Sequence, residues 1–116
     1  MIQKRFNSVS VSSAGDYFQV LFEGGEDKSE WDYFLLQCQF EDPSDGDAFY
    51  MESGDIKLCG HVQVESAFLS RRFLRLDMPS TKWMSIQIEF SANQALYRKL
   101  ARMLRTMFRN RLIVDS

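Results

Sequence analysis

The sequence predicts an α+β domain, a mostly antiparallel sheet of five to seven strands with one long C-terminal amphipathic helix packed on one face. Two observations support this prediction. Apolar and polar residues alternate along most of the first three quarters of the chain, which is typical of half-buried strands. The period then changes to that of an amphipathic helix after residue 91. The 116 residues have the length of one domain, residues 1–116.

A glycine pair separates the first two strand patterns from the third. A weak strand pattern spans Phe6–Val11, and a clear one spans Tyr17–Glu23, which ends at the pair Gly24–Gly25. The aromatic and apolar run Trp31–Phe40 is typical of a well-buried central strand. The segment Glu41–Asp47 then combines Asp, Pro, Ser and Gly, which favour turns, and predicts an exposed acidic loop.

Four further strand patterns follow this loop. Ala48–Ser53 predicts a short strand, and Leu58–Glu65 predicts another. Phe68–Asp77 predicts a hairpin partner with its bend near Leu69–Arg72. Met84–Phe90 alternates cleanly, as half-buried antiparallel strands do.

The helix is predicted over Ala92–Arg109. Ser91 is a good N-cap residue, and Gln94 stands three residues later, which completes the pattern of a capping box. One side of this helix carries a wide apolar stripe, formed by Leu96, Tyr97, Leu100, Met103, Leu104, Met107 and Phe108. The other side carries arginines, which we interpret as a solvated face rather than a nucleic-acid contact. Leu112–Ser116 forms either a last short strand or a frayed end.

Charge is divided unevenly along the chain. Residues 23–55 hold eleven carboxylates and one cation, Lys28, a net charge of −10. Residues 98–111 hold six cations and no acid. The formal net charge of −2 therefore hides a polarised molecule, and such polarity steers encounters with a partner of opposite charge.

The residues available for catalysis are few. His61 is the single histidine, and we expect it to be structural, because a general base needs an orienting partner. Cys38 and Cys59 lie in apolar runs and are expected to be buried free thiols. An enzyme that uses Cys59 or His61 remains an alternative, and there alanine at either position would abolish activity without unfolding the chain. The sequence has no glycine-rich phosphate loop, and its acidic loop lacks the ligand spacing of a calcium-binding EF-hand. We therefore expect no enzyme activity, no metal and no cofactor.

Short motifs from Trp31 onward resemble a known family. They are Tyr33-Phe34-Leu35-Leu36-Gln37, Phe49-Tyr50-Met51-Glu52, Leu58-Cys59-Gly60-His61-Val62 and Ile86-Gln87-Ile88-Glu89-Phe90, followed by the amphipathic helix. Their order resembles the type-10 immunity proteins of bacterial polymorphic toxin systems, over about two thirds of the chain. His61 replaces the family's usual second glycine.

The resemblance implies a small, non-catalytic cytoplasmic protein that binds and neutralises a cognate protein toxin. A basic toxin, such as a nuclease, would suit the acidic segment. The absence of a signal-peptide pattern and of a long apolar run also favours the cytoplasm, with no membrane or nucleic-acid partner. We expect a monomer or small homo-oligomer, and the alternative is a homo-oligomeric structural or regulatory module without a toxin partner. The expected partner-binding residues are Trp31, Glu41, Asp42, Asp45, Asp47, Tyr50, Glu52 and Asp55.

Overall fold

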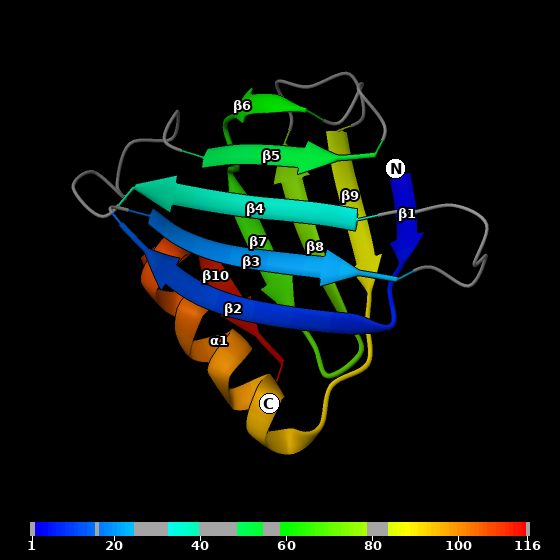
Figure 1. The fold of residues 1–116 in the computed structure, drawn as a ribbon. Helices are drawn as coiled ribbons and strands as arrows, with labels where there is room; N and C mark the ends of the chain where they lie inside the picture. Colours follow the sequence, from blue (N-terminus) through cyan, green and yellow to red (C-terminus); the bar gives the residue numbers. More distant parts are fainter. Residues whose placement is uncertain are drawn as a thin grey trace.

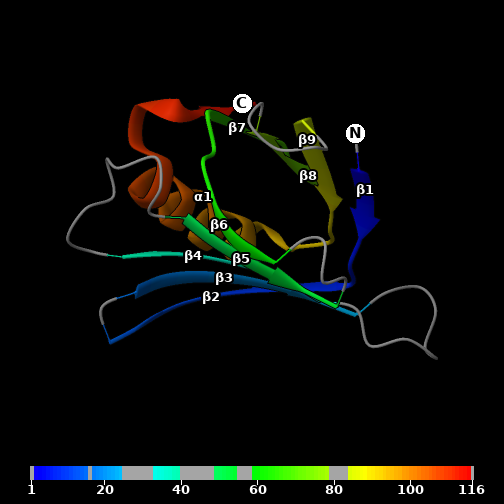
Figure 2. The ribbon, with the colours of Figure 1, turned by 90° about the horizontal axis from the view of Figure 1, so that it is seen from above.

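The fold consists of two sheets that lie face to face, with a helix between them at one side (Figures 1 and 2). The structure is a computed structural model, and it describes residues 2–15, 17–24, 33–39, 49–54, 59–78 and 84–115. Each sheet has five strands within these residues. Figure 2 shows the two layers edge-on, with α1 on the inner side of both.

One sheet, which we call the front sheet, is antiparallel throughout and follows the order of the chain. Its strands are β2 (Ser8–Ala14), β3 (Tyr17–Glu23), β4 (Tyr33–Gln39), β5 (Phe49–Ser53) and β6 (Gly60–Val62), in the spatial order β2-β3-β4-β5-β6. Each strand pairs with the next one along the chain, so the sheet is a meander with edges at β2 and β6.

The back sheet combines segments from both ends of the chain. Its strands are β1 (Ile2–Arg5), β7 (Ser66–Leu69), β8 (Phe73–Met78), β9 (Met84–Glu89) and β10 (Leu112–Val114), in the spatial order β1-β9-β8-β7-β10. The pairs β7-β8 and β8-β9 are antiparallel. Both edge strands, β1 and β10, are parallel to their neighbours β9 and β7.

The core fills the space between the sheets. In Figure 1 the front strands run across the back strands, as in sandwiches whose sheets pack at a steep angle. Phe22 of β3 lies at the centre of an aromatic cluster, with ring-centroid distances of 6.0 Å to Phe6, 6.5 Å to Phe34 and 5.7 Å to Phe90. All four rings are buried, so this cluster joins the two sheets where β1, β9 and β3 converge.

Helix α1 (Gln94–Phe108) closes one side of the sandwich. Its apolar stripe is buried at Leu100, Ala101, Leu104, Met107 and Phe108. The helix contacts β2 and β3 of the front sheet and β7 and β10 of the back sheet. The Phe108 ring stacks on that of Phe49 in β5 at 4.6 Å, and the 3-10 helix η3 (Arg109–Arg111) then leads into β10.

The α+β class and the C-terminal amphipathic helix are confirmed, but the prediction of one sheet is wrong. The ten strands of the described residues divide between two sheets, and the helix packs against both rather than on one face. Alternation indicates which side chains of a strand are buried, but it does not indicate which sheet the strand joins. The helix of 15 residues is also shorter than the predicted Ala92–Arg109.

Two local predictions are also corrected. The N-cap is Asn93, not Ser91, because the Asn93 side chain accepts a hydrogen bond from the Leu96 amide at 2.8 Å. The predicted strand Leu58–Glu65 is reduced to Gly60–Val62, where Gly60 has a φ of +127°, a value that side chains disfavour. By contrast, the bounds of Tyr17–Glu23 are confirmed, and so is the bend before Phe73.

Candidate protein-binding face

The outer face of the front sheet is the candidate functional site. The inward positions of β3, β4 and β5 are buried, apart from the half-buried Phe18, so the alternate positions point away from the core. In Figure 2 no labelled helix or strand lies over this face. The described outward side chains are Ser8, Ser10, Ser12, Tyr17, Gln19, Leu21, Glu23, Tyr33, Leu35, Gln37, Tyr50, Glu52 and His61.

Strand register arranges these side chains in rows across the sheet. One row is polar and runs through Gln19, Gln37, Tyr50 and His61. The next runs through Leu21, Leu35 and Glu52, and a third pairs Glu23 with Tyr33. Cross-strand neighbours lie within side-chain contact of each other, so aliphatic, aromatic and acidic groups form one continuous surface.

Tyrosine and glutamate side chains interact on this face. The pKa of Tyr33 is raised, first because neighbouring groups remove water from its hydroxyl, and then because Glu52, Cys59 and Tyr50 disfavour a negative charge there. The Tyr50 ring also lies beside that of His61, with centroids 5.4 Å apart. Tyr33, Tyr50 and Glu52 therefore form one cluster over β4 and β5.

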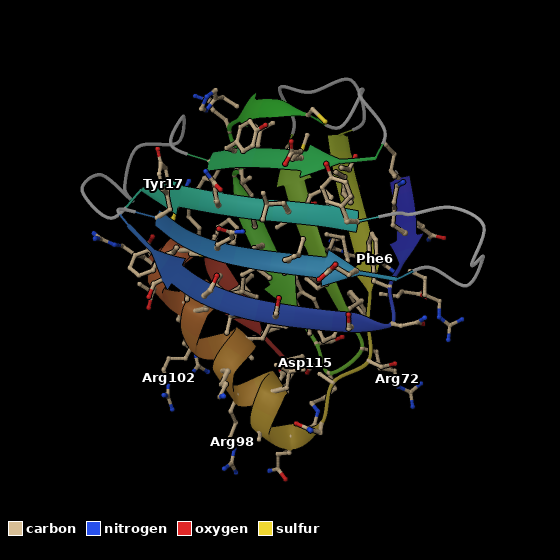
Figure 3. All side chains as sticks on the ribbon, in the orientation of Figure 1. Phe6, Tyr17, Arg72, Arg98, Arg102 and Asp115 are labelled. Atoms are coloured by element: carbon tan, nitrogen blue, oxygen red, sulfur yellow. The ribbon has the colours of Figure 1, made fainter. Side chains whose placement is uncertain are left out.

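The charge of this face is negative. Glu23 and Glu52 point outward from the strands of the front sheet, whereas no Lys or Arg does so within the part of these strands that the structure describes. The cations of α1 lie elsewhere: Figure 3 shows Arg98 and Arg102 on the helix, below the strands of the front sheet in this view. The two described carboxylates of residues 23–55 thus lie on a different surface from the cations of α1.

The cysteine prediction is confirmed for one residue and wrong for the other. Cys38 is buried, whereas Cys59 is exposed. The Cys59 sulfur accepts a hydrogen bond from the Ser53 amide at 3.5 Å and donates one to the Ser53 carbonyl at 3.4 Å. Cys59 directly precedes β6 and alternates with Gly60, so it has the outward parity of His61 rather than that of the core positions. The expected structural role of His61 stays a prediction.

Two of the predicted partner-binding residues lie on this face. Tyr50 and Glu52 occupy neighbouring outward positions of β5, and both are half-buried. The other six, Trp31, Glu41, Asp42, Asp45, Asp47 and Asp55, lie outside the described residues. They belong to segments that connect β3 to β4, β4 to β5 and β5 to β6, so all six come from connections between strands of the front sheet.

Sequence reasoning missed the outward residues of β3 and β4. Leu21, Tyr33, Leu35 and Gln37 share the face with Tyr50 and Glu52. The signal was available, because Tyr33, Leu35 and Gln37 are the positions that alternate with the buried Phe34, Leu36 and Cys38. The aromatic and apolar content of that run had instead predicted a well-buried central strand, and its outward positions were not considered as contacts.

No group of three or more His, Cys, Asp or Glu side chains that could hold a metal ion occurs within the described ranges. The helix found there, α1, is neither long nor apolar enough to cross a membrane. The sequence matches no model of a protein family, and no curated protein matches it significantly.

Proposed function

We propose that this protein is a non-catalytic immunity protein that binds a cognate bacterial toxin in the cytoplasm and neutralises it. The observation that supports this best is the outer face of the front sheet, which bears tyrosines, leucines and glutamates and is covered by no described helix or strand. Tyrosines that can be desolvated at the centre of a contact are frequent anchors of protein interfaces.

Charge supports a basic partner. Glu23 and Glu52 lie on the face, and the acidic connections of the same sheet add to the charge of −10 that residues 23–55 carry. Carboxylates of this kind pair with Arg and Lys, and their field speeds the encounter with a basic surface. A nuclease toxin has such a surface around its substrate cleft, so it is the toxin class that we propose first.

A pull-down from the native host tests this proposal. The tagged protein and its Tyr50→Ala/Glu52→Lys variant are used as baits at low and high salt, and bound proteins are identified by mass spectrometry. We expect the original chain to recover a basic protein with a toxin domain at low salt, less of it at high salt, and the variant to recover much less. A third bait, Glu65→Lys, is the matched control, because Glu65 is exposed but lies outside the front sheet. Equal recovery by all three baits would contradict the proposed face.

The acidic loop Glu41–Asp47 is proposed as a contact from the charge of its sequence alone. Reversal of Asp42, Asp45 and Asp47 to lysine is therefore a separate test, scored by survival of cells that express the toxin. Intact protection and binding in this triple variant would remove the loop from the proposal but would leave the role of the sheet face open to the test above.

A second candidate function is a homo-oligomeric module, and one observation favours it. Ile113 of the edge strand β10 is 60% exposed, and its neighbour in β7, Phe68, packs on Phe73 with ring centroids 5.8 Å apart. An apolar residue at a sheet edge favours pairing with a second copy. Light scattering of the purified protein separates the two candidate functions. The homo-oligomeric module predicts an oligomer that Ile113→Lys dissociates. Tyr17→Lys, the matched change at another exposed position, should leave that oligomer intact.

A further inference from the structure

A small cavity opens between α1 and the edge of the front sheet. It has a volume of about 240 Å³ and is lined by Val11 of β2, Phe18 of β3 and Lys99, Arg102, Met103 and Thr106 of α1. Val11, Phe18 and Met103 are half-buried and pack against the hydrophobic core. The floor of the cavity is therefore apolar, and its size is below the range of cavities that hold whole drug-sized ligands. A cavity of this kind fits one bulky apolar group.

The charged groups at the rim of this cavity are both cations. Lys99 and Arg102 line it and are exposed. Arg98 and Arg105 are also exposed on α1, and the helix contains no acidic residue. The β2 strand, which forms the opposite wall, is made of Ser, Val and Ala only. An apolar group that enters the cavity would therefore bind best with carboxylates beside it.

The cavity adjoins a free backbone edge. β2 pairs with β3 on one side, and within the described residues no strand pairs with its other side. The strand is seven residues long, which is enough for several backbone hydrogen bonds to an added strand. An extended peptide that pairs with such an edge directs every second side chain to the same face of the sheet. The inner face of the front sheet at β2 is the face on which α1 and the cavity lie, so these side chains of the peptide could reach the cavity.

We propose that β2 and α1 together bind an extended acidic segment of a protein partner, which adds to the edge of the front sheet and places one bulky apolar side chain in the cavity. Backbone pairing with β2 would hold the segment, the apolar floor would select Leu, Ile or Phe, and Lys99 and Arg102 would select acidic flanking residues. This site lies on the opposite side of the front sheet from the proposed toxin-binding face, so it is a second interaction surface and does not depend on the first.

Fluorescence polarisation tests the chemistry of the segment. The probe is a labelled nine-residue peptide of aspartate and serine with one central leucine, and the control peptides replace that leucine with serine or the aspartates with asparagine. We expect the probe to bind saturably and either control peptide to bind at least fivefold more weakly. In the protein, Lys99→Glu/Arg102→Glu should weaken binding at least tenfold, whereas Arg98→Glu, a matched reversal one position outside the cavity, should change it no more than about twofold.

Amide NMR shifts tell backbone pairing apart from simple charge attraction. We expect the probe peptide to shift amide signals of residues 8–14 as well as those of 99–106. Three results would overturn the proposal: no saturable binding of the probe, equal binding of the control peptides, or shifts confined to α1. A fourth result would also overturn the proposal: decanoate displaces the probe and binds without shifting the β2 amide signals. The cavity would then be assigned to small amphipathic anions.

Discussion

Arg111, which follows α1, contacts the front sheet and the segment between β6 and β7. Its Nη1 donates a hydrogen bond to the carbonyl of the buried Val64 at 2.9 Å, and its guanidinium lies 5.4 Å from the centre of the Phe49 ring. We predict that Arg111→Met lowers the free energy of unfolding by about 2 kcal/mol, because a charge-assisted hydrogen bond and a cation–π contact are lost together. Urea titration measures this, and Arg105→Met, at an exposed position of the helix, should change it by less than about 0.5 kcal/mol. Equal effects of the two changes would contradict the assigned role.

The two thiols should react very differently. Burial raises the pKa of Cys38 to about 11, although Arg111 acts in the opposite direction, so this thiol stays protonated at neutral pH. Cys59 is exposed. We predict that a thiol-specific disulfide reagent labels one cysteine in the folded protein at pH 8, identified as Cys59 by mass spectrometry, and two after unfolding. Rapid labelling of Cys38 in the folded protein would contradict its burial.

Cys38 also gives the stability a defined pH dependence. In the unfolded chain its thiol loses its proton near the ordinary pKa of 9.0, whereas the folded protein keeps the proton to about pH 11. The unfolded state therefore binds fewer protons between these values, and stability falls as pH rises from about 9 to about 11, by up to about 1.4 kcal/mol per pH unit from this group. Unfolding titrations of the original chain and of Cys38→Ala should differ in this slope. Parallel slopes would show that Cys38 does not contribute.

At the level of elements, the start of α1 offers a direct test. Asn93 accepts the Leu96 amide hydrogen bond, whereas Ser91, which the sequence pattern favoured, lies two residues earlier. We predict that Asn93→Ala lowers stability by about 1 kcal/mol, as loss of an N-cap does, and that Ser91→Ala changes it by less than about 0.5 kcal/mol. Thermal unfolding followed by circular dichroism distinguishes the two, and the reverse order of effects would place the cap at Ser91.

The elements that the sequence could predict are those whose pattern is local. The alternation of Tyr17–Glu23 and Met84–Glu89 and the apolar stripe of α1 follow from residue spacing alone. The strand β1 was not predicted, because Ile2–Arg5 contains one apolar residue and forms a strand through parallel pairing with β9. The division into two sheets depends likewise on contacts between residues distant in the chain, such as Phe6 with Phe22.

The same difference applies to the candidate site. Tyr50 and Glu52 could be selected from the sequence because of their type and their acidic neighbourhood. Alternation could place Tyr33 and Leu35 on the outer side of their strand, but it could not place them, or Leu21, beside Tyr50 and Glu52. That neighbourhood depends on the register of three strands. A one-residue change of register would turn these side chains into the core. The residue types at a contact are thus readable from sequence, but the surface that they form is a property of the fold.

In the whole molecule, the described positive and negative side chains lie on different parts of the architecture. The helix carries four exposed cations, Arg98, Lys99, Arg102 and Arg105, at one side of the sandwich. The outer face of the front sheet carries Glu23 and Glu52 and no described Lys or Arg. The proposed toxin-binding face and the proposed peptide site therefore attract partners of opposite charge. Binding at the first should weaken with Glu52→Lys and binding at the second with Arg102→Glu, and neither change should affect the other site.

The most direct test of the proposed function is the affinity of the isolated toxin domain for purified protein, measured by titration calorimetry. The account predicts a one-to-one complex that Tyr50→Ala/Glu52→Lys weakens at least a hundredfold, since about 3 kcal/mol is lost when an aromatic anchor and a paired carboxylate are removed from an interface. Glu65→Lys should leave the affinity within about twofold. An affinity that all three proteins share would contradict the claim that the outer face of the front sheet binds the toxin.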